Sequence, residues 1–181
     1  MADTNGANGA TTEDIVEKYD VLPKMIQYLD RHLIFPLLED RDDTIENKQL
    51  KAELLKGTNM FDYLGKLDAE IKGQSQPAKE FAAKREDVIK KRDTLEEHTE
   101  KLRGLLEDEA VVSNFRSDKV ANLKYLETEH GVQPEMVNAL YDFGNFQYSC
   151  GEYQQAADVL YQFRVLVCGS NTSRNVWQRQ G

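Results

Sequence analysis

Three histidines and two cysteines are the residues of this 181-residue chain that are best suited to chemistry. Imidazole and thiolate groups bind zinc when several of them lie at short, regular spacing, and a thiolate becomes a nucleophile beside a base. His32, His98 and His130 each fall in a different expected helix, with no second ligand at metal spacing. Cys150 and Cys168 have no base partner in the sequence. The sequence therefore predicts no metal site, no cofactor and no enzyme.

The strongest pattern in the chain is a pair of helices between residues 134 and 166. Leu140, Gly144 and Tyr148 recur every four residues, which places them on one face of a first helix. Gly151 then suits the left-handed turn that ends many helices. Gly144 costs a helix about 1 kcal/mol relative to alanine, so we expect it where two backbones approach closely.

The second helix of the pair has an inner face at the same periodicity, formed by Tyr153, Ala156, Leu160 and Phe163. Together the two helices match the spacing of the tetratricopeptide repeat at Leu140, Gly144, Gly151, Tyr153, Ala156 and Leu160. Such hairpins stack into solenoids that bind other proteins. We therefore expect an all-α fold, a tetratricopeptide-like right-handed solenoid.

The first expected helix begins near Tyr19, and Pro36 should bend or end it. Its apolar stripe consists of Leu22, Ile26, Leu29, Leu33 and Leu37, widened by Met25, Ile34 and Leu38. A second helix opens at Thr44 and closes at Gly57.

A third helix is expected from a cap at Thr58 or Asn59 to Gly73, with Met60, Leu64, Leu67 and Ile71 on one side. After a linker at residues 73–77, a long helix should span Ala78–Glu107. Its apolar residues lie seven apart, at Phe81, Val88, Leu95 and Leu102. The second apolar position of each heptad is mostly Lys, Arg or His, so the apolar stripe is narrow. This favours a long helix packed on neighbouring helices over a coiled coil.

A further helix should start at Ser117 and Asp118, run through Val120, Leu123 and Leu126, and stop at Gly131. No stretch alternates as a strand does. We divide the chain into a disordered tail (1–18), a helical domain (19–166) and an irregular tail (167–181).

The charge and hydropathy of the chain limit the classes of molecule that it could bind. The formal charge of -9 argues against direct nucleic-acid binding, and we interpret the basic residues at 84–85 and 90–92 as a solvated helix face in preference to an RNA contact. No apolar run is long enough for a membrane span, and the N-terminus lacks a secretory signal. Free thiols in a reducing compartment fit the two cysteines best, although a disulfide stays open. We expect a cytoplasmic protein.

Tyr141, Asn145 and Tyr148 are candidate partner-binding residues. They lie on the first helix of the hairpin, and first helices line the inner groove of a tetratricopeptide stack. The alternative, which we favour, is that Tyr148 packs in the core and Tyr141 is an incidental surface residue.

Three segments resemble the e subunit of eukaryotic translation initiation factor 3: Tyr28–Glu39, Thr58–Tyr63 and Phe146–Leu166. The resemblance covers about residues 19–166. It implies a scaffold that assembles with the other subunits of that factor, and indirectly with the small ribosomal subunit, during formation of the preinitiation complex. Members of that family continue into a PCI module with a winged helix.

That PCI module is missing here. Because one hairpin near the end of the chain cannot bury both of its faces, we expect a fragment of a longer solenoid in preference to a chain whose exposed face a partner covers. Two alternatives stay open. One is a subunit of the related proteasome lid or signalosome, and the other is a stand-alone repeat adaptor that grips a peptide.

Overall fold

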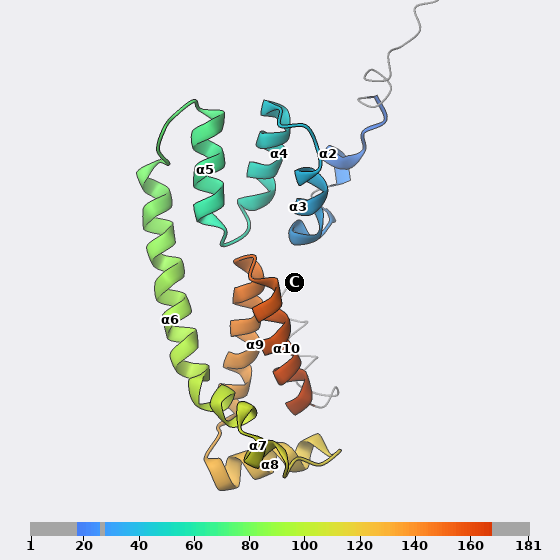
Figure 1. Cartoon of the computed structure of the whole chain (residues 1–181), viewed down its shortest axis with the longest axis vertical. Coiled ribbons are helices and arrows are strands. Elements are labelled where there is room, and N and C mark those ends of the chain that lie inside the picture. Colours follow the sequence, from blue (N-terminus) through green and yellow to red (C-terminus); the bar gives the residue numbers. More distant parts are fainter. Residues whose placement is uncertain (1–17, 26–27, 168–181) are drawn as a thin grey trace, which may run out of the picture.

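The structure, a computed structural model, describes residues 18–25 and 28–167. Within these residues every regular element is a helix, as predicted (Figure 1). The helices are α2 (Leu22–Met25), α3 (Arg31–Glu39), α4 (Ile45–Leu55), α5 (Phe61–Ile71), α6 (Lys79–Glu107), α7 (Glu109–Val112), α8 (Lys119–His130), α9 (Pro134–Ser149) and α10 (Tyr153–Leu166). Residues 1–17 of the expected tail, Ile26 and Cys168 lie outside the described residues.

Helices α3, α4 and α5 form an N-terminal layer, which lies beyond the turn of the α9–α10 hairpin (Figure 1). Its buried residues, which we call the N-terminal cluster, are Ile34, Phe35, Leu38, Leu54, Leu55, Leu64 and Leu67. Phe81 of α6 packs against this cluster. The long helix thus begins beside the N-terminal layer.

The first expected helix is interrupted, because Asp30 caps a new helix. Its carboxylate accepts hydrogen bonds from the backbone N–H groups of His32 (2.9 Å) and Leu33 (3.3 Å). Pro36 does not end α3, which continues to Glu39. An N-cap aspartate satisfies amides that have no partner within the helix, which fixes the start of α3 at this point.

The predicted apolar stripe of this region is correct only in part. The side chains of Leu33 and Leu37 are 71% and 57% exposed, whereas Ile34 and Leu38 are buried. The helix carries apolar residues on two adjacent faces, and α4 covers only one of them. Sequence periodicity could not distinguish the two faces because both repeat every four residues.

The caps of α4 and α5 differ in how well they were predicted. The hydroxyl of Thr44 accepts from the N–H of Asn47 at 3.2 Å, which confirms the start of α4. The predicted cap of α5 at Thr58 or Asn59 is wrong, since the N-cap residue is Met60 and no side chain caps it. Asn59 is engaged elsewhere, with the hydroxyl of a residue at the end of α9.

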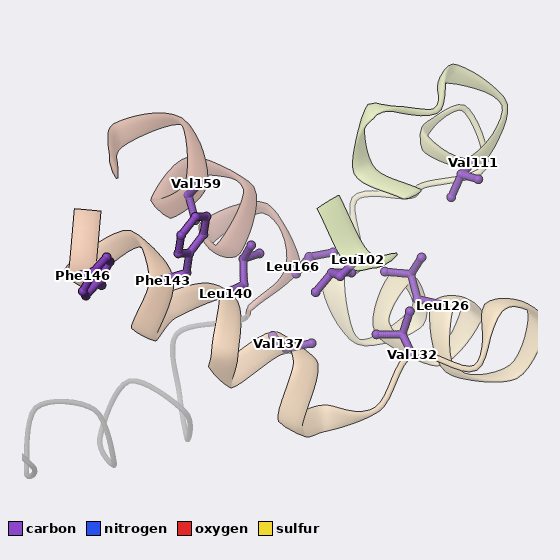
Figure 2. Packing of buried hydrophobic residues seen from close by; sticks show 10 residues of the cluster. All are labelled: Leu102, Val111, Leu126, Val132, Val137, Leu140, Phe143, Phe146, Val159 and Leu166. Atoms are coloured by element: carbon purple, nitrogen blue, oxygen red, sulfur yellow. The ribbon is translucent and has the colours of Figure 1, made fainter. Parts of the chain in front are cut away.

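Helices α6, α8, α9 and α10 form a C-terminal layer around the second core, in which α9 packs against both α6 and α10. Its buried residues, the C-terminal cluster, are Leu102, Val111, Leu126, Val132, Val137, Leu140, Phe143, Phe146, Val159 and Leu166. Figure 2 shows Phe143 pointing from α9 toward Val159 of α10. The predicted hairpin is confirmed: Pro134 is the first residue of α9, and Gly151 in the turn has φ of 83°.

Two details of the hairpin differ from expectation. A Cβ atom on Gly144 would lie 2.7 Å from Cγ and Cδ2 of Leu160, so the glycine makes room for a side chain and not for a second backbone. Ala156 is buried as predicted, but Tyr153 is 40% exposed. Val159, which the predicted inner face omitted, is buried in its place.

The long helix α6 spans 29 residues and runs beside both layers (Figure 1). This confirms the expected helix packed on its neighbours. Helix α8 is capped by Asp118, whose carboxylate accepts from the N–H of Val120 at 2.9 Å, and it ends at Gly131 with φ of 62°. Leu126 is buried in α8, whereas Val120 is 64% exposed. The four-residue helix α7 was not predicted.

Candidate interaction surfaces

A group of four polar and aromatic side chains joins α3 to the hairpin. We call Asp30, His32, Tyr148 and Tyr153 the aromatic junction. The hydroxyl of Tyr148 donates to Oδ1 of Asp30 at 2.8 Å, and the hydroxyl of Tyr153 lies 2.9 Å from Nδ1 of His32. The His32 ring is tilted against Tyr148, with centroids 4.5 Å apart, and meets Tyr153 edge-on at 5.5 Å.

The pKa values of the four side chains in the aromatic junction differ from their ordinary values. Burial raises the pKa of Tyr148 to about 12, and the hydrogen bond to the Asp30 carboxylate adds to this shift. Burial also raises the pKa of Tyr153. Burial opposes the charged form of Asp30, but hydrogen bonds from Tyr148 and two backbone amides outweigh it, so the pKa of Asp30 is lowered. Burial lowers the pKa of His32, although the Asp30 carboxylate opposes this. At neutral pH the junction therefore pairs one carboxylate with neutral rings.

A second contact fixes the hairpin turn against the loop before α5. The backbone N–H of Asn59 donates to the carbonyl of Ser149 at 2.9 Å, and its side-chain amide donates to the Ser149 hydroxyl at 2.5 Å. A Cβ on Gly151 would lie 3.2 Å from Sδ and Cε of Met60. The N-terminal layer therefore contacts the turn of the hairpin through both polar and apolar groups.

The three predicted partner-binding residues already have neighbours within the chain. Tyr148 is half-buried in the aromatic junction, and the ring of Tyr141 lies 5.1 Å from that of Phe163. Asn145, between them, is half-buried. Neither tyrosine is a pure core residue or an isolated surface residue. A role in binding a partner stays a prediction.

Several large apolar side chains of α2, of the residues after it and of α3 are exposed, and the predicted apolar stripe included four of them, Met25, Leu29, Leu33 and Leu37. We call these residues the N-terminal apolar face: Val21, Met25, Tyr28, Leu29, Leu33 and Leu37. Tyr28 is 81% exposed. Contiguous exposed apolar residues mark sites of protein–protein contact more often than single ones do. The signal for this surface was in the sequence, as a second apolar stripe on the same helix.

The described residues offer no group of three or more His, Cys, Asp or Glu side chains arranged to hold a metal ion. His130 instead lies beside Tyr125, with Nε2 3.3 Å from the hydroxyl. Burial raises the pKa of the Cys150 thiol, which disfavours the reactive thiolate. Within the described residues no helix has the length and apolar character needed to cross a bilayer.

The basic residues at 84–85 and 90–92 of α6 lie exposed, which fits a solvated helix face and does not test an RNA contact. Arg85 pairs with Asp62 of α5 at 3.0 Å, and Arg92 pairs with Asp93 at 2.9 Å. The first of these ion pairs links α6 to the N-terminal layer. Exposed pairs of this kind contribute little to stability, about 0–1 kcal/mol.

Comparison with known proteins identifies relatives over most of the chain. Residues 20–147 match the family model described as "eIF3 subunit 6 N terminal domain". The E subunit of eukaryotic translation initiation factor 3 from Emericella nidulans is 56% identical over 166 residues, which are 90% of this chain. Its counterparts from Aspergillus fumigatus and Phaeosphaeria nodorum are 57% and 50% identical over 86% and 92% of the chain. The aligned part covers 37%, 35% and 38% of the lengths of these three relatives.

Proposed function

We propose that this chain, which belongs to the family of the E subunit of eukaryotic translation initiation factor 3, is a structural scaffold within that factor. It promotes assembly of the preinitiation complex on the small ribosomal subunit through protein–protein contacts. It acts in the cytoplasm and without catalysis. Its helices are the N-terminal part of a tetratricopeptide-like solenoid that leads toward a PCI module.

The observation that carries this proposal is the N-terminal apolar face. Leu33 and Leu37 lie one helical turn apart on α3, and both remain exposed while Ile34 and Leu38 on the adjacent face are buried. Burial of apolar area on association contributes about 25 cal/mol per Å². A face of this kind fits a neighbouring protein that covers it in the assembled factor.

The test is co-purification of the tagged chain from Emericella nidulans, whose E subunit is 56% identical to this chain. We expect other subunits of initiation factor 3 to be recovered with it. A double variant, Leu33→Asp with Leu37→Asp, should lower their recovery about tenfold or more, because the new carboxylates would be buried at the interface.

The control is Val120→Asp, which places one such carboxylate on an apolar residue of α8 that is 64% exposed. It should leave the recovery unchanged, and circular dichroism should show equal helicity in all variants. Absence of every initiation factor 3 subunit from the purified material would refute the proposal. Recovery of proteasome-lid or signalosome subunits instead would favour that related assembly, and binding of peptides alone would favour an adaptor.

A further inference from the structure

The exposed apolar residues of α3 are followed by a group of exposed carboxylates. Leu33, Leu37 and Asp40 are spaced by four and then three residues, which places them on one face of the helix. Asp40 keeps right-handed helical angles (φ −75°, ψ −6°), so this face continues to it. Glu39 and Asp42 are also exposed. Within the part of the chain that the structure describes, no ion pair engages any of these three carboxylates.

The position of these carboxylates is unfavourable for the helix itself. The C-terminal end of an α-helix carries a partial negative charge, so a cation stabilises it and an anion destabilises it. The last turn of α3 contains no basic residue, and the helix ends in Glu39 and Asp40. The two arginines of this region are engaged: Arg31 donates to a backbone carbonyl of α4 at 3.3 Å, and Arg41 pairs with Asp20 at 2.8 Å. A cation from another molecule would therefore stabilise this end of α3.

The shape of the N-terminal apolar face fits a further helix. Leu33 and Leu37 form a row of side chains one turn apart, and such rows pack into the grooves on the surface of a second helix. An extended strand would instead pair with the free edge of a sheet, and every regular element of the described residues is a helix. Helix α3 stands at the end of the row formed by α5, α4 and α3, with only the four-residue α2 beyond it (Figure 1).

The charges argue against two other occupants of this face. A second copy of the chain would bring the same carboxylates, and its Arg31 and Arg41 would be engaged in the same way. The formal charge of -9 on each copy also opposes their association. Residues 1–17 contain no lysine or arginine, so this segment has no side-chain cation to offer. The required cation therefore comes from a different protein.

We propose that the N-terminal apolar face binds an amphipathic helix of another protein that carries lysine or arginine residues beside its apolar stripe. The apolar side chains of that helix cover Leu33 and Leu37, and its cations pair with Glu39, Asp40 and Asp42. This inference rests on the proposed function, because it specifies the chemistry of the neighbouring protein that covers this face. Complementary charges of this kind raise the rate and the specificity of association.

The test compares the binding of two designed amphipathic peptides to the full chain, measured by fluorescence anisotropy. Each peptide has about 18 residues, or about five helical turns. Both have the same leucine stripe at helical spacing, and glutamine alternates with lysine at the polar positions of one peptide and with glutamate in the other. The dissociation constant of the glutamate peptide should be at least about tenfold higher than that of the lysine peptide. Added salt should weaken the binding of the lysine peptide, because it screens exposed charges.

Two double variants locate the charges that the lysine peptide contacts. Glu39→Gln with Asp40→Asn should raise the dissociation constant of the lysine peptide about fivefold, because two exposed ion pairs are lost. The matched control is Glu127→Gln with Glu129→Gln, which removes the same charge from exposed residues in the last turn of α8. It should leave the dissociation constant unchanged. Equal losses from the two double variants would overturn the proposal.

The apolar part of the surface is tested by Leu33→Asn with Leu37→Asn, which removes the apolar contacts and adds no charge. This variant should abolish saturable binding of the lysine peptide, while circular dichroism shows unchanged helicity. Equal binding of the two peptides to the unaltered chain, or no saturable binding of the lysine peptide, would overturn the proposal. So would a dimer in analytical ultracentrifugation that this variant dissociates, because a second copy would then occupy the face.

Failure of this inference differs from failure of the proposed function. In one case Leu33→Asp with Leu37→Asp lowers the recovery of initiation factor 3 subunits, but the chain shows no preference for the lysine peptide. That result would support the proposed function and overturn the inferred charge of the partner. In the other case the chain prefers the lysine peptide, but no initiation factor 3 subunit is recovered with it. That result would refute the proposed function and support the inferred chemistry of the surface.

Discussion

The two layers of the molecule differ in how completely they cover their apolar residues. In the C-terminal layer α9 lies between α6 and α10, so Leu140 has neighbours on both sides and is fully buried. In the N-terminal layer α3 packs mainly against α4, and the ring of Phe35 also meets that of Tyr63 of α5 at 5.3 Å. Leu38 is buried against the N-terminal cluster, but Leu37, next to it in the sequence, is 57% exposed. The apolar residues of α3 are more than α4 can cover, and under the proposed function a neighbouring protein covers the rest.

The layers also differ in how they contact each other. The C-terminal layer is built mainly from apolar packing among its own helices. Its hairpin turn meets the N-terminal layer through hydrogen bonds, such as those from Tyr148 to Asp30 and from Asn59 to Ser149. Hydrogen bonds of this kind contribute about 0.5–1.5 kcal/mol each. We therefore expect the contact between the layers to open before either core unfolds.

Substitutions at two leucines of α3, one buried and one exposed, give the strongest test of incomplete coverage in the N-terminal layer. Leu38→Ala removes a side chain with 0% exposure and should lower the free energy of unfolding by about 2–5 kcal/mol. Leu33→Ala, at a site 71% exposed, should change it by no more than about 0.5 kcal/mol. Urea denaturation followed by circular dichroism measures both. A large loss from Leu33→Ala would show that the N-terminal apolar face is packed within the chain.

In the C-terminal layer, Gly144→Ala should lower the free energy of unfolding by about 1–3 kcal/mol, because the new methyl group would overlap the Leu160 side chain. The control is Gly104→Ala in α6, where a Cβ meets nothing within 4 Å. This change should raise stability by about 0.5–1 kcal/mol, since alanine favours the helix. Adding Leu160→Val to Gly144→Ala should recover part of the loss. Thermal unfolding would show whether Gly144→Ala lowers stability while Gly104→Ala raises it. A loss of stability in both variants would contradict the steric explanation.

Between the layers, Tyr148→Phe should lower stability by about 0.5–1.5 kcal/mol, because it removes the hydrogen bond to Asp30. Hydrogen exchange should become faster in α3 than in the core of α9. Tyr161→Phe, at a site 67% exposed, provides the same chemical change on the surface and should have no measurable effect. Equal effects of the two substitutions on stability would show that the aromatic junction does not stabilise the contact between the two layers.

The smallest expected effect is a pH dependence from His32. Burial lowers the pKa of His32 in the folded chain below its ordinary value of about 6.5. The unfolded chain therefore binds the proton more readily, and the stabilising contribution present above about pH 6.5 is lost as the pH falls through the lowered pKa. The free energy of unfolding should be measured at one pH above 6.5 and one below it. The difference between these two values should be larger for the unaltered chain than for the His32→Phe variant. The same difference in both proteins would exclude His32 as the source.

The hairpin was predictable because its signals are local. Pro134 begins α9, Gly151 adopts the left-handed conformation in the turn, and the repeat of Leu140 and Gly144 gives the buried face. Long helix α6 was predictable for a similar reason, since its 29 residues contain no proline and follow a linker. Signals of this kind depend on residues within one or two turns of each other.

The surfaces between elements could not be predicted in the same way. His32 and Tyr153, which meet in the aromatic junction, are 121 residues apart in the chain. The buried face of α3 depended on the position of α4, and no property of the stripe itself distinguishes Leu33 from Ile34.

Helix α6 has a geometric role that follows from its contacts at each end. Phe81 touches the N-terminal cluster, and Leu102 is buried in the C-terminal cluster. Each residue of an α-helix turns the chain by about 100° and advances it by about 1.5 Å. One residue inserted between these two contacts would therefore twist the layers out of alignment, whereas removal of a whole heptad would shorten their separation and nearly preserve their orientation. The number of residues between the two contacts of α6 therefore sets both the distance between the layers and their rotation about the helix axis.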